Sequence, residues 1–480
     1  MIRKKFNAAG MVEFCTREQM EEFHSAALEL LQDTGMEIQH KGAIQMLKDA
    51  GCYVKRKRVH FPPSLVEWAL KSAPSHIKVY DRNGRMTMDL GAGNVYFGTG
   101  SDCVGLYNWE TKTHEAFSEQ DLIDGYKIAD ACENIDFLMC LGLLYQYPKT
   151  NYEHQFYLMM TNSGKPMVVT AADRDCIEHI FQMAAIVRGG EEELRNKPLF
   201  ILYDEPTSPM NHTYTAVDKL IYCAENMIPT NYSPGIMFGA TGPMSVEGTL
   251  VLAIAECLAG LVINQLAKPG APFVFGSCSA EMDMKCMQPT YSSPYTYIFN
   301  GVIGQMGKEF YHLPTWSMGG STGSKIPDAQ ALSDATQQAY MAALTGNNLN
   351  HDVGFMNYGL TFSYELLVMM EEVIAEIRAM FKGIDSEEIE KSVELIKEIG
   401  PKGNYLAEEH TIYHLKRMWN PKLMDRNDYV NWQKKGSLTL EERAHEKVLD
   451  LIAHYEPEQL PEKIQKKVED YLREIDQKAL

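Results

Sequence analysis

Acidic and aromatic side chains follow the short apolar runs in the middle of the chain. Asp204 and Glu205 come directly after the run LFILY, where adjacent carboxyls could act as acid and base, or could simply end a loop before Pro206. Aromatic residues recur at the same places: Phe97, Tyr203, Phe238, Phe275, Trp316, Phe355 and Tyr358. Aromatic faces beside a carboxylate suit a quaternary ammonium ion, each face contributing about 0.5–2 kcal/mol. The alternative is that these rings only pack a core.

A glycine-rich loop follows Trp316. Its glycines are Gly319, Gly320 and Gly323, and Lys325 comes two residues later. The spacing differs from the phosphate-binding pattern GxxxxGK[ST], so nucleotide binding is disfavoured. Glycine allows close approach of another group, and a helix beginning near Pro327 would direct its positive end toward an anion.

The familiar metal and nucleophile motifs are missing from the sequence. HxH, HExxH and GxSxG are absent, and Cys278 and Cys286 lack the spacing of a zinc ligand pair. No serine or cysteine has a base that the sequence reveals. We therefore expect no metal in this chain.

The apolar runs recur every 30–42 residues and are separated by helical patterns. One such helix opens with a capping box, Ser118 with Asp121. Eight alternating strands and helices predict an α/β fold with a parallel sheet, and favour a (β/α)8 TIM barrel over an open doubly wound sheet. The eight predicted strands start at Val95, Phe137, Met167, Leu199, Pro234, Pro272, Leu313 and Asp352.

Helical segments flank the predicted barrel. Residues 1–94 predict helices and a β-hairpin that turns at Asn83-Gly84, residues 95–382 the barrel, and residues 383–480 a charged helical extension. We expect these extensions to cover the barrel ends or to contribute to a homo-oligomer.

Composition excludes several classes of protein. The 480 residues carry a net charge of −19, which argues against nucleic-acid binding. The ten cysteines form no CxxC pair, and the basic N-terminus lacks the apolar stretch of a signal peptide. The most apolar window, Leu250 to Ala267, is interrupted by Glu256 and Gln265 and is expected to be a core helix. A cytoplasmic protein with reduced thiols and no membrane span is expected.

Four segments together resemble one family. LYDEPTSPM, PGIMFGATGPMS, LPTWSMGGSTGSKIPDAQA and NHDVGFMNYGLTFSYE are similar to the trimethylamine methyltransferase (MttB) superfamily, and the likeness extends over most of the chain. Members are (β/α)8-barrel enzymes that transfer a methyl group from an amine to Co(I) of a separate corrinoid protein. The archaeal trimethylamine enzyme carries pyrrolysine, which this sequence lacks; we place the equivalent position in or near Ser321–Ile326.

The resemblance implies a quaternary amine as substrate, because a quaternary nitrogen departs as a neutral tertiary amine without acid, base or metal. Non-pyrrolysine members include demethylases of glycine betaine, proline betaine, carnitine and γ-butyrobetaine. The expected cofactor is a corrinoid (cobalamin) on the partner protein.

Site residues follow from this hypothesis. Glu205 and His351 are the expected catalytic residues, His351 and Lys325 also the candidates for the substrate carboxylate, and Gly319, Gly320 and Gly323 would admit the corrin ring. The substrate residues are Phe97, Phe238, Trp316, Lys325, His351, Phe355 and Tyr358. Three alternatives stay open: a metal-dependent TIM-barrel hydrolase, a non-catalytic betaine-binding protein, and a family member that uses an ordinary methylamine.

Overall fold

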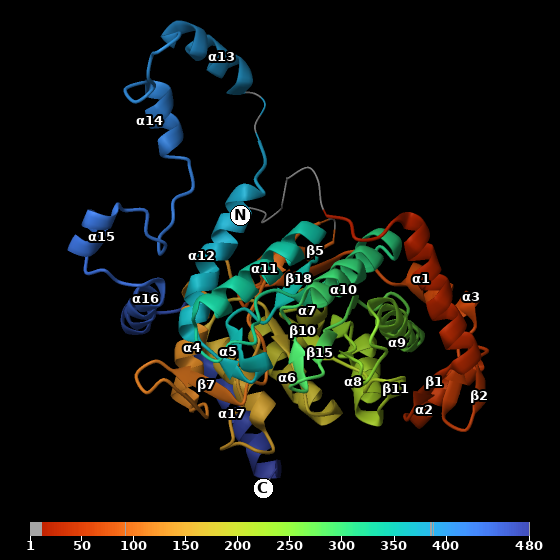
Figure 1. Cartoon of the computed structure of the whole chain (residues 1–480). Helices are drawn as coiled ribbons and strands as arrows, with labels where there is room; N and C mark the ends of the chain where they lie inside the picture. The colour runs from red at the N-terminus through yellow and green to blue at the C-terminus, as the bar shows by residue number, and fades with distance from the viewer. Residues whose placement is uncertain (1–11, 92, 385, 387, 480) are drawn as a thin grey trace.

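A seven-stranded parallel sheet forms the centre of the protein (Figure 1). The computed structural model describes residues 12–91, 93–384, 386 and 388–479, so the predicted absence of a signal peptide falls outside the described residues. Every pair of neighbouring strands is parallel. In sheet order the strands are β6 (Tyr96–Phe97), β18 (Leu349–His351), β17 (Thr315–Met318), β14 (Phe273–Gly276), β12 (Thr230–Tyr232), β10 (Phe200–Asp204) and β9 (Met167–Val169).

The sheet curls so that its two outer strands approach each other. Single parallel bridges join Gly98 to Phe137 and Leu138 to Met167, so residues 137–138 connect β6 with β9. The segment predicted as strand two therefore supplies these bridges without forming a regular strand.

The interior of the curled sheet is filled by apolar side chains from successive strands. They alternate with side chains that face the surrounding helices, as strand geometry requires. The interior members are Tyr96, Phe137, Met139, Val168, Ile201, Val274, Trp316 and Leu349. The predicted hairpin is confirmed as β4 (Ile77–Tyr80) and β5 (Met86–Leu90), and its Ile77, Val79, Met88 and Leu90 belong to the same cluster.

A helix follows each strand in the sheet. The predicted capping box of Ser118 and Asp121 is confirmed at the start of α4. The helices around the sheet are α4 (Glu119–Ala131), α5 (Asn151–Asn162), α6 (Arg174–Arg188), α7 (Glu191–Asn196), α8 (Tyr214–Glu225), α9 (Val246–Ala267), α10 (Pro294–Gln305), α11 (Ala329–Thr345) and α12 (Tyr364–Met380). The helix α9 is long and apolar enough to cross a membrane, but 78% of its most apolar window is buried, as in a core helix.

Capping of α9 leads to a stability prediction. Ser245 Oγ accepts the backbone N–H of Gly248 at 3.2 Å. Ser245→Ala removes this cap and is expected to lower the free energy of unfolding by about 1 kcal/mol, measured from the urea midpoint. Ser245→Asp keeps a favoured capping residue and should retain the native midpoint. Equal midpoints for all three proteins would contradict the prediction.

Two predicted strands were misplaced. The fifth strand is β12, whereas Met237–Phe238 (β13) pairs with β15 (Ala280–Asp283), which pairs with β16 (Gln288–Thr290). The eighth strand is β18, so His351 ends the strand that it was expected to precede. The apolar runs that follow these strands belong to small sheets; the second comprises β19 (Phe355–Met356), β20 (Thr361–Phe362), β7 (Gly105–Asn108) and β8 (Thr113–Glu115).

The N-terminal segment packs beside α9. Thr16 and Gln19 form a capping box at the start of the first helix, and a π-helical turn, Leu30–Thr34, is followed by Gly35 as its C-cap. Both α1 and α3 contact α9. The elements are α1 (Arg17–Glu29), α2 (Lys41–Asp49), α3 (Pro63–Ser72), β1 (Met36–Ile38), β2 (Tyr53–Lys55), β3 (Arg58–His60) and, from later in the chain, β11 (Asn211–His212).

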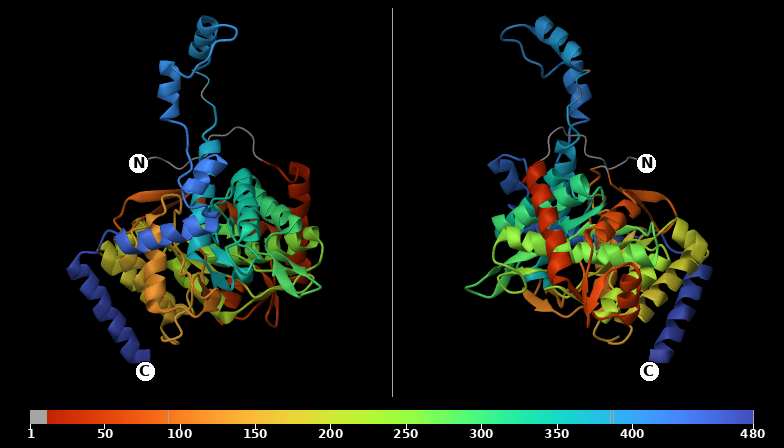
Figure 2. Two further views of the ribbon diagram at one scale, coloured as in Figure 1. Left: turned by 60° about the vertical axis from the view of Figure 1, so that its left-hand side comes forward. Right: turned by 90° about the vertical axis from the view of Figure 1, so that its right-hand side faces the viewer.

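The C-terminal segment leaves the body of the protein and returns to it. Figures 1 and 2 show α13 (Glu388–Ile399) and α14 (Glu409–Leu415) projecting from the end of α12; we call the segment from Glu388 to Ser437 the arm. The arm also contains α15 (Tyr429–Lys434). The chain then packs α16 (Leu440–His454) on α12 and α4, and α17 (Glu462–Ala479) on α6 and α5.

Candidate active site

Trp316 lies at the centre of the candidate site. It is fully buried in β17, and its backbone packs against Gly276 of β14, where an added methyl group would lie 2.5 Å from the Trp316 carbonyl oxygen. Its ring stacks on the imidazole of His351 with centroids 4.4 Å apart and planes 27° apart, and lies 5.5 Å from the Tyr203 ring. Three strands, β10, β17 and β18, thus bring three rings together, with Tyr203 and His351 near the carboxyl ends of their strands and Trp316 within β17.

His351 lies between a carboxylate and a sulfur. Its Nδ1 is 2.6 Å from Asp352 Oδ1, and its Nε2 is 3.0 Å from Cys278 Sγ. Trp316 Nε1 also donates to Cys278 Sγ at 3.1 Å. Burial alone would lower the pKa of His351, but the Asp352 carboxylate and the Cys278 sulfur raise it to about 10. The imidazole is therefore a cation at neutral pH, with both ring nitrogens already engaged.

The sequence did not reveal this Cys278–His351–Asp352 series. A thiol, an imidazole and a carboxylate in such an order can activate a sulfur nucleophile, or can fix the position of the rings around it. Cys278 follows β14 by two residues and lies 73 residues before His351 in the sequence. The spacing of the two residues along the chain therefore does not indicate that they are in contact.

Glu205 lies beside the aromatic group, at the end of β10. The Tyr203 hydroxyl donates to its Oε2 at 3.1 Å. The Glu205 side chain is exposed to solvent on one side, yet the protein packed around its other sides raises its pKa to about 7 by desolvation, despite the Tyr203 hydrogen bond. Neighbouring Asp204 is buried and lies 3.0 Å from Lys219 Nζ; burial raises its pKa to about 6, even with the lysine beside it. Glu205 can thus change charge near neutral pH.

Two further polar groups lie near the strand ends: Asp102, which the sequence places after the first strand, and Asn231, which the sequence analysis missed. Asp102 follows β6 with a left-handed backbone (φ 64°), and burial raises its pKa although Tyr152 and Thr170 hydrogen-bond to it. Asn231, opposite Tyr203 in the β10–β12 pairing, is fully buried, and neither atom of its amide has a hydrogen-bond partner among the described residues. The burial of Asn231 could have been predicted from the sequence only if the fifth strand had been placed at Thr230–Tyr232.

The predicted aromatic cage is not assembled as a whole. Phe97 and Phe355 belong to the core between sheet and helices, where Phe355 lies 6.0 Å from Phe362. Phe238 packs 5.4 Å from Phe299 and lines a separate surface cavity of about 460 Å³ with Met244 and other residues. Of the predicted aromatic residues, Trp316 stacks on His351, and Tyr203 lies edge-on to it with ring centroids 6.3 Å apart.

Lys325 and Tyr358 form a pair of their own. Lys325 Nζ lies 4.3 Å from the centre of the Tyr358 ring, donates to its hydroxyl at 2.9 Å, and donates to the Gly323 carbonyl at 2.6 Å. His114 binds the Lys325 carbonyl through Nε2 at 2.7 Å. The lysine is thus held against the loop by contacts within the chain.

The three loop glycines are buried against β18 and the segment after it. An added methyl group would lie 2.8 Å from Asn350 Cβ at Gly319, 3.0 Å from Val353 Cα at Gly320 and 2.9 Å from Tyr358 at Gly323. Close packing of two loops therefore accounts for these glycines, and their contact with a corrin ring stays a prediction.

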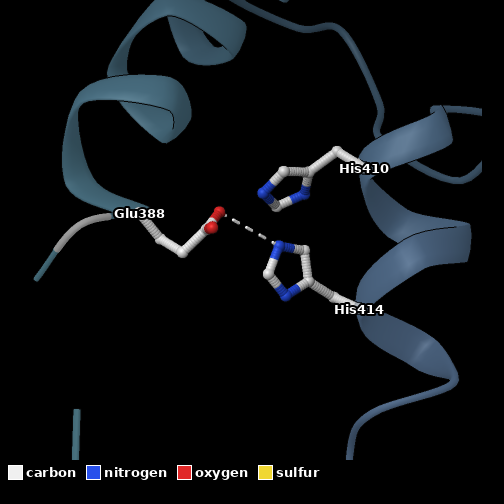
Figure 3. Close-up of side chains that lie close together, drawn as sticks. All are labelled: Glu388, His410 and His414. Carbon is white, nitrogen blue, oxygen red and sulfur yellow. Dashed lines mark ion pairs between the residues drawn. The ribbon is translucent and has the colours of Figure 1, made fainter. Parts of the chain in front are cut away.

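A group with metal-ligand spacing lies far from this site. Among the residues that the structure describes, the three His, Cys, Asp or Glu side chains whose ligand atoms lie within 4.8 Å of one another are Glu388, His410 and His414 of the arm (Figure 3). The site around Trp316 therefore rests on aromatic faces, carboxyls and the Cys278–His351 contact.

Comparison with known proteins assigns the chain to a family. The family model described as trimethylamine methyltransferase (MTTB) matches residues 2–478. The chain belongs to this family. It is 32% identical over 462 residues to the trimethylamine methyltransferase MttB of Desulfitobacterium hafniense strain DCB-2, covering 96% of this chain and 92% of the relative. It is 29% identical over 461 residues to a glycine betaine methyltransferase of D. hafniense strain Y51, covering 95% and 96%. The MTTB family member described here is a methyltransferase.

Solved structures share the fold of this MTTB family member. The hydroxylamine complex of MtmB superposes with a TM-score of 0.52 at 14% identity, covering 92% of this chain and 89% of that one. The monomethylamine methyltransferase MtmB of Methanosarcina barkeri gives a TM-score of 0.51 at 13% identity, with the same coverage. These likenesses support the α/β fold with its curled parallel sheet.

Proposed function

We propose that this methyltransferase demethylates a quaternary amine of the betaine class and transfers the methyl group to Co(I) of a corrinoid carried by a cognate protein. The grouping of Glu205 with the Tyr203 and Trp316 rings is the observation that carries the proposal. A carboxylate and π-faces attract a quaternary ammonium, which has no N–H to donate. The relative named as a glycine betaine methyltransferase, similar over almost the whole chain, supports this substrate class.

The chemistry asks little of the protein beyond placement. The N–CH3 bond breaks as the methyl group passes to Co(I), and its electron pair stays on nitrogen, which leaves as a neutral tertiary amine. No proton must move. Residues at the site need to hold the N–CH3 bond in line with the acceptor and to exclude water. An aromatic-rich site in which Trp316 and His351 are buried is suited to that task.

The predicted site residues differ in how directly the structure supports a role for them. Glu205 supplies negative charge next to the ammonium, Trp316 supplies a π-face, and His351 positions that ring through Asp352 and Cys278. Phe97, Phe238, Lys325, Phe355 and Tyr358 stay predictions as substrate residues, as do Gly319, Gly320 and Gly323 at the corrinoid contact. Because both nitrogens of His351 are engaged, binding of the substrate carboxylate there requires that one of these contacts opens.

Trimethylamine is the second candidate substrate, favoured by the 32% identical relative that is named for it. A neutral amine is a poor leaving group, and the archaeal trimethylamine enzyme carries pyrrolysine. Between Ser321 and Ile326 this chain has Ser, Thr, Gly, Ser, Lys and Ile. This segment has no pyrrolysine to activate a tertiary amine such as trimethylamine, which favours the quaternary substrate.

A methyl-transfer assay tests the proposal. Purified protein is mixed with Co(I) cobalamin, or with the corrinoid partner, and glycine betaine, proline betaine, carnitine, γ-butyrobetaine or trimethylamine; cobalt methylation is followed by absorbance. Turnover with one or more quaternary amines is expected. Turnover with trimethylamine alone would favour the second candidate. Calorimetric binding of a betaine without methyl transfer would indicate a binding protein, and hydrolysis that depends on stoichiometric zinc would indicate a hydrolase.

The architecture and setting form part of the proposal. We take the sheet with its two bridges as a closed (β/α)8 barrel within residues 95–382, flanked by 1–94 and 383–480. The ten cysteines form no disulfide and support a cytoplasmic setting. Exposed apolar residues on the arm support contact with another protein, either a second copy in a homo-oligomer or the corrinoid protein; examples are Ile389, Ile396, Leu406 and Leu415.

A further inference from the structure

The arm contains two helices that lack a hydrophobic core of their own. Neither α13 nor α14 has a buried residue, yet the two helices lie side by side at His414 and Glu388 (Figure 3). The side-chain contact between them is an ion pair, with His414 Nε2 3.4 Å from Glu388 Oε2. An isolated ion pair contributes only about 0–1 kcal/mol, so it does not explain why these helices meet.

Two histidines present their rings on one face of α14. His410 and His414 are four residues apart, about one helical turn, and their ring centroids lie 4.2 Å apart. The Nε2 atoms of both rings are shielded from solvent and make no hydrogen bond within the described part of the chain. A shielded nitrogen without a hydrogen bond is costly. His414 Nε2 has only the 3.4 Å contact with Glu388, and His410 Nε2 lies beside it, so one bound ion could serve both nitrogens.

A carboxylate from the neighbouring helix completes the group. Glu388 begins α13, and its Oε1 is 3.2 Å from Lys391 Nζ, whereas its Oε2 faces His414. The three possible ligand atoms lie within 4.8 Å of one another. A tetrahedral zinc ion with bonds of about 2.0–2.2 Å needs ligand atoms about 3.3–3.6 Å apart, a distance that small side-chain rotations can reach.

We propose that Glu388, His410 and His414 bind one divalent transition-metal ion, with zinc as the expected occupant, which joins α13 to α14. Two imidazoles and one carboxylate match the preference of Zn²⁺ and its neighbours in the first transition row, whereas Ca²⁺ and Mg²⁺ prefer oxygen alone. Three protein ligands leave a fourth position for water. The ion would supply the folding free energy that the coreless pair of helices lacks. The site is independent of the methyl-transfer reaction.

Metal titration of the full chain, purified without a histidine tag and stripped with EDTA, tests the site. The native chain is expected to take up one Zn²⁺ per molecule in calorimetry, and Co²⁺ in its place should give the visible absorption of a tetrahedral site. His410→Ala, His414→Ala and Glu388→Gln should each weaken zinc affinity by more than about tenfold, since even outer-shell changes typically cost about 10- to 100-fold. His454→Ala, an exposed histidine outside the arm, is the matched control and should bind as the native chain does.

Limited proteolysis provides a second readout that does not depend on affinity. Zinc should slow cleavage of the native arm several-fold, leave the His410→Ala/His414→Ala double variant unprotected, and protect the His454→Ala control. Zinc uptake by the double variant equal to that of the native chain would overturn the site. Zinc binding without slower cleavage of the native arm would overturn the joining of α13 to α14.

Discussion

His351→Asn is expected to lower kcat/KM for methyl transfer by about 100-fold or more. Asparagine cannot reach Asp352 and Cys278 at once, so the ring of Trp316 loses the stacked cation that fixes it, at 4.4 Å in the native protein. Displacement of a reacting group by about 1 Å can cost about 100-fold, and the loss should fall mainly on kcat because His351 acts through its neighbours. The measurement is steady-state methylation of Co(I) cobalamin with the preferred amine.

A second His–Asp pair supplies the control. His76 lies 3.4 Å from Asp89 at an exposed position, so His76→Asn should change kcat/KM less than about twofold. Stability gives an independent check. The pKa of His351 is raised to about 10, so its stabilising contribution is complete below an unfolded pKa of about 6.5 and is lost as pH rises toward 10. The native and His351→Asn urea midpoints should therefore converge with rising pH; a constant difference, or an unchanged kcat, would contradict the role given to His351.

A strand was predicted correctly where its own residues are mainly apolar. FVFG in β14 and FILYD in β10 are largely apolar, and both strands were located correctly. β12 and β18 are short and contain Asn231 and Asn350, so neither has the sequence of an apolar strand. The fifth and eighth strands were therefore predicted at the apolar runs that follow them. A strand buried on both faces is recognisable when it is apolar; polar groups placed inside remove that signal.

The candidate site was predicted in part for a related reason. Trp316 and His351 stack on each other, and Glu205 is linked to them through Tyr203. Strand parity explains the failure at Phe97: Tyr96 faces the interior, so its neighbour Phe97 faces the helices. Phe238 and Phe355 failed because their runs belong to the small sheets. The Cys278–His351 contact joins two strands and depends on sheet order. His410 and His414 have the spacing of HExxH without its glutamate, and the search for HxH and HExxH passed over them.

Glu205→Gln is expected to lower kcat/KM for a quaternary amine by about 10- to 100-fold at pH 8 and to remove an inflection near pH 7. Desolvation raises the pKa of Glu205 to about 7, so the native carboxyl is largely neutral at pH 6 and largely ionised at pH 8. The attraction for a cationic substrate therefore grows with pH in the native enzyme and cannot grow in the variant. Breaking a fully buried charge pair costs about 2–5 kcal/mol, and the exposure of Glu205 places its loss at or below the lower end of that range.

The pH profile of kcat/KM from pH 5.5 to 9 is the measurement, with Glu462→Gln on the exposed face of α17 as the control. A residual inflection near pH 6 in Glu205→Gln would belong to Asp204, whose pKa is raised to about 6.

The stability of Glu205→Gln should change in the opposite sense to its activity. The raised pKa means that the folded state favours the protonated carboxyl, so this residue destabilises the native protein increasingly as pH rises from about 4.5 to 7. Glu205→Gln should consequently unfold at higher urea than the native chain above pH 7, while it demethylates more slowly. If the variant keeps both the inflection near pH 7 and the native rate, Glu205 does not take part in substrate binding. Slower turnover combined with higher stability would show that the ionised carboxylate destabilises the fold but binds the cationic substrate.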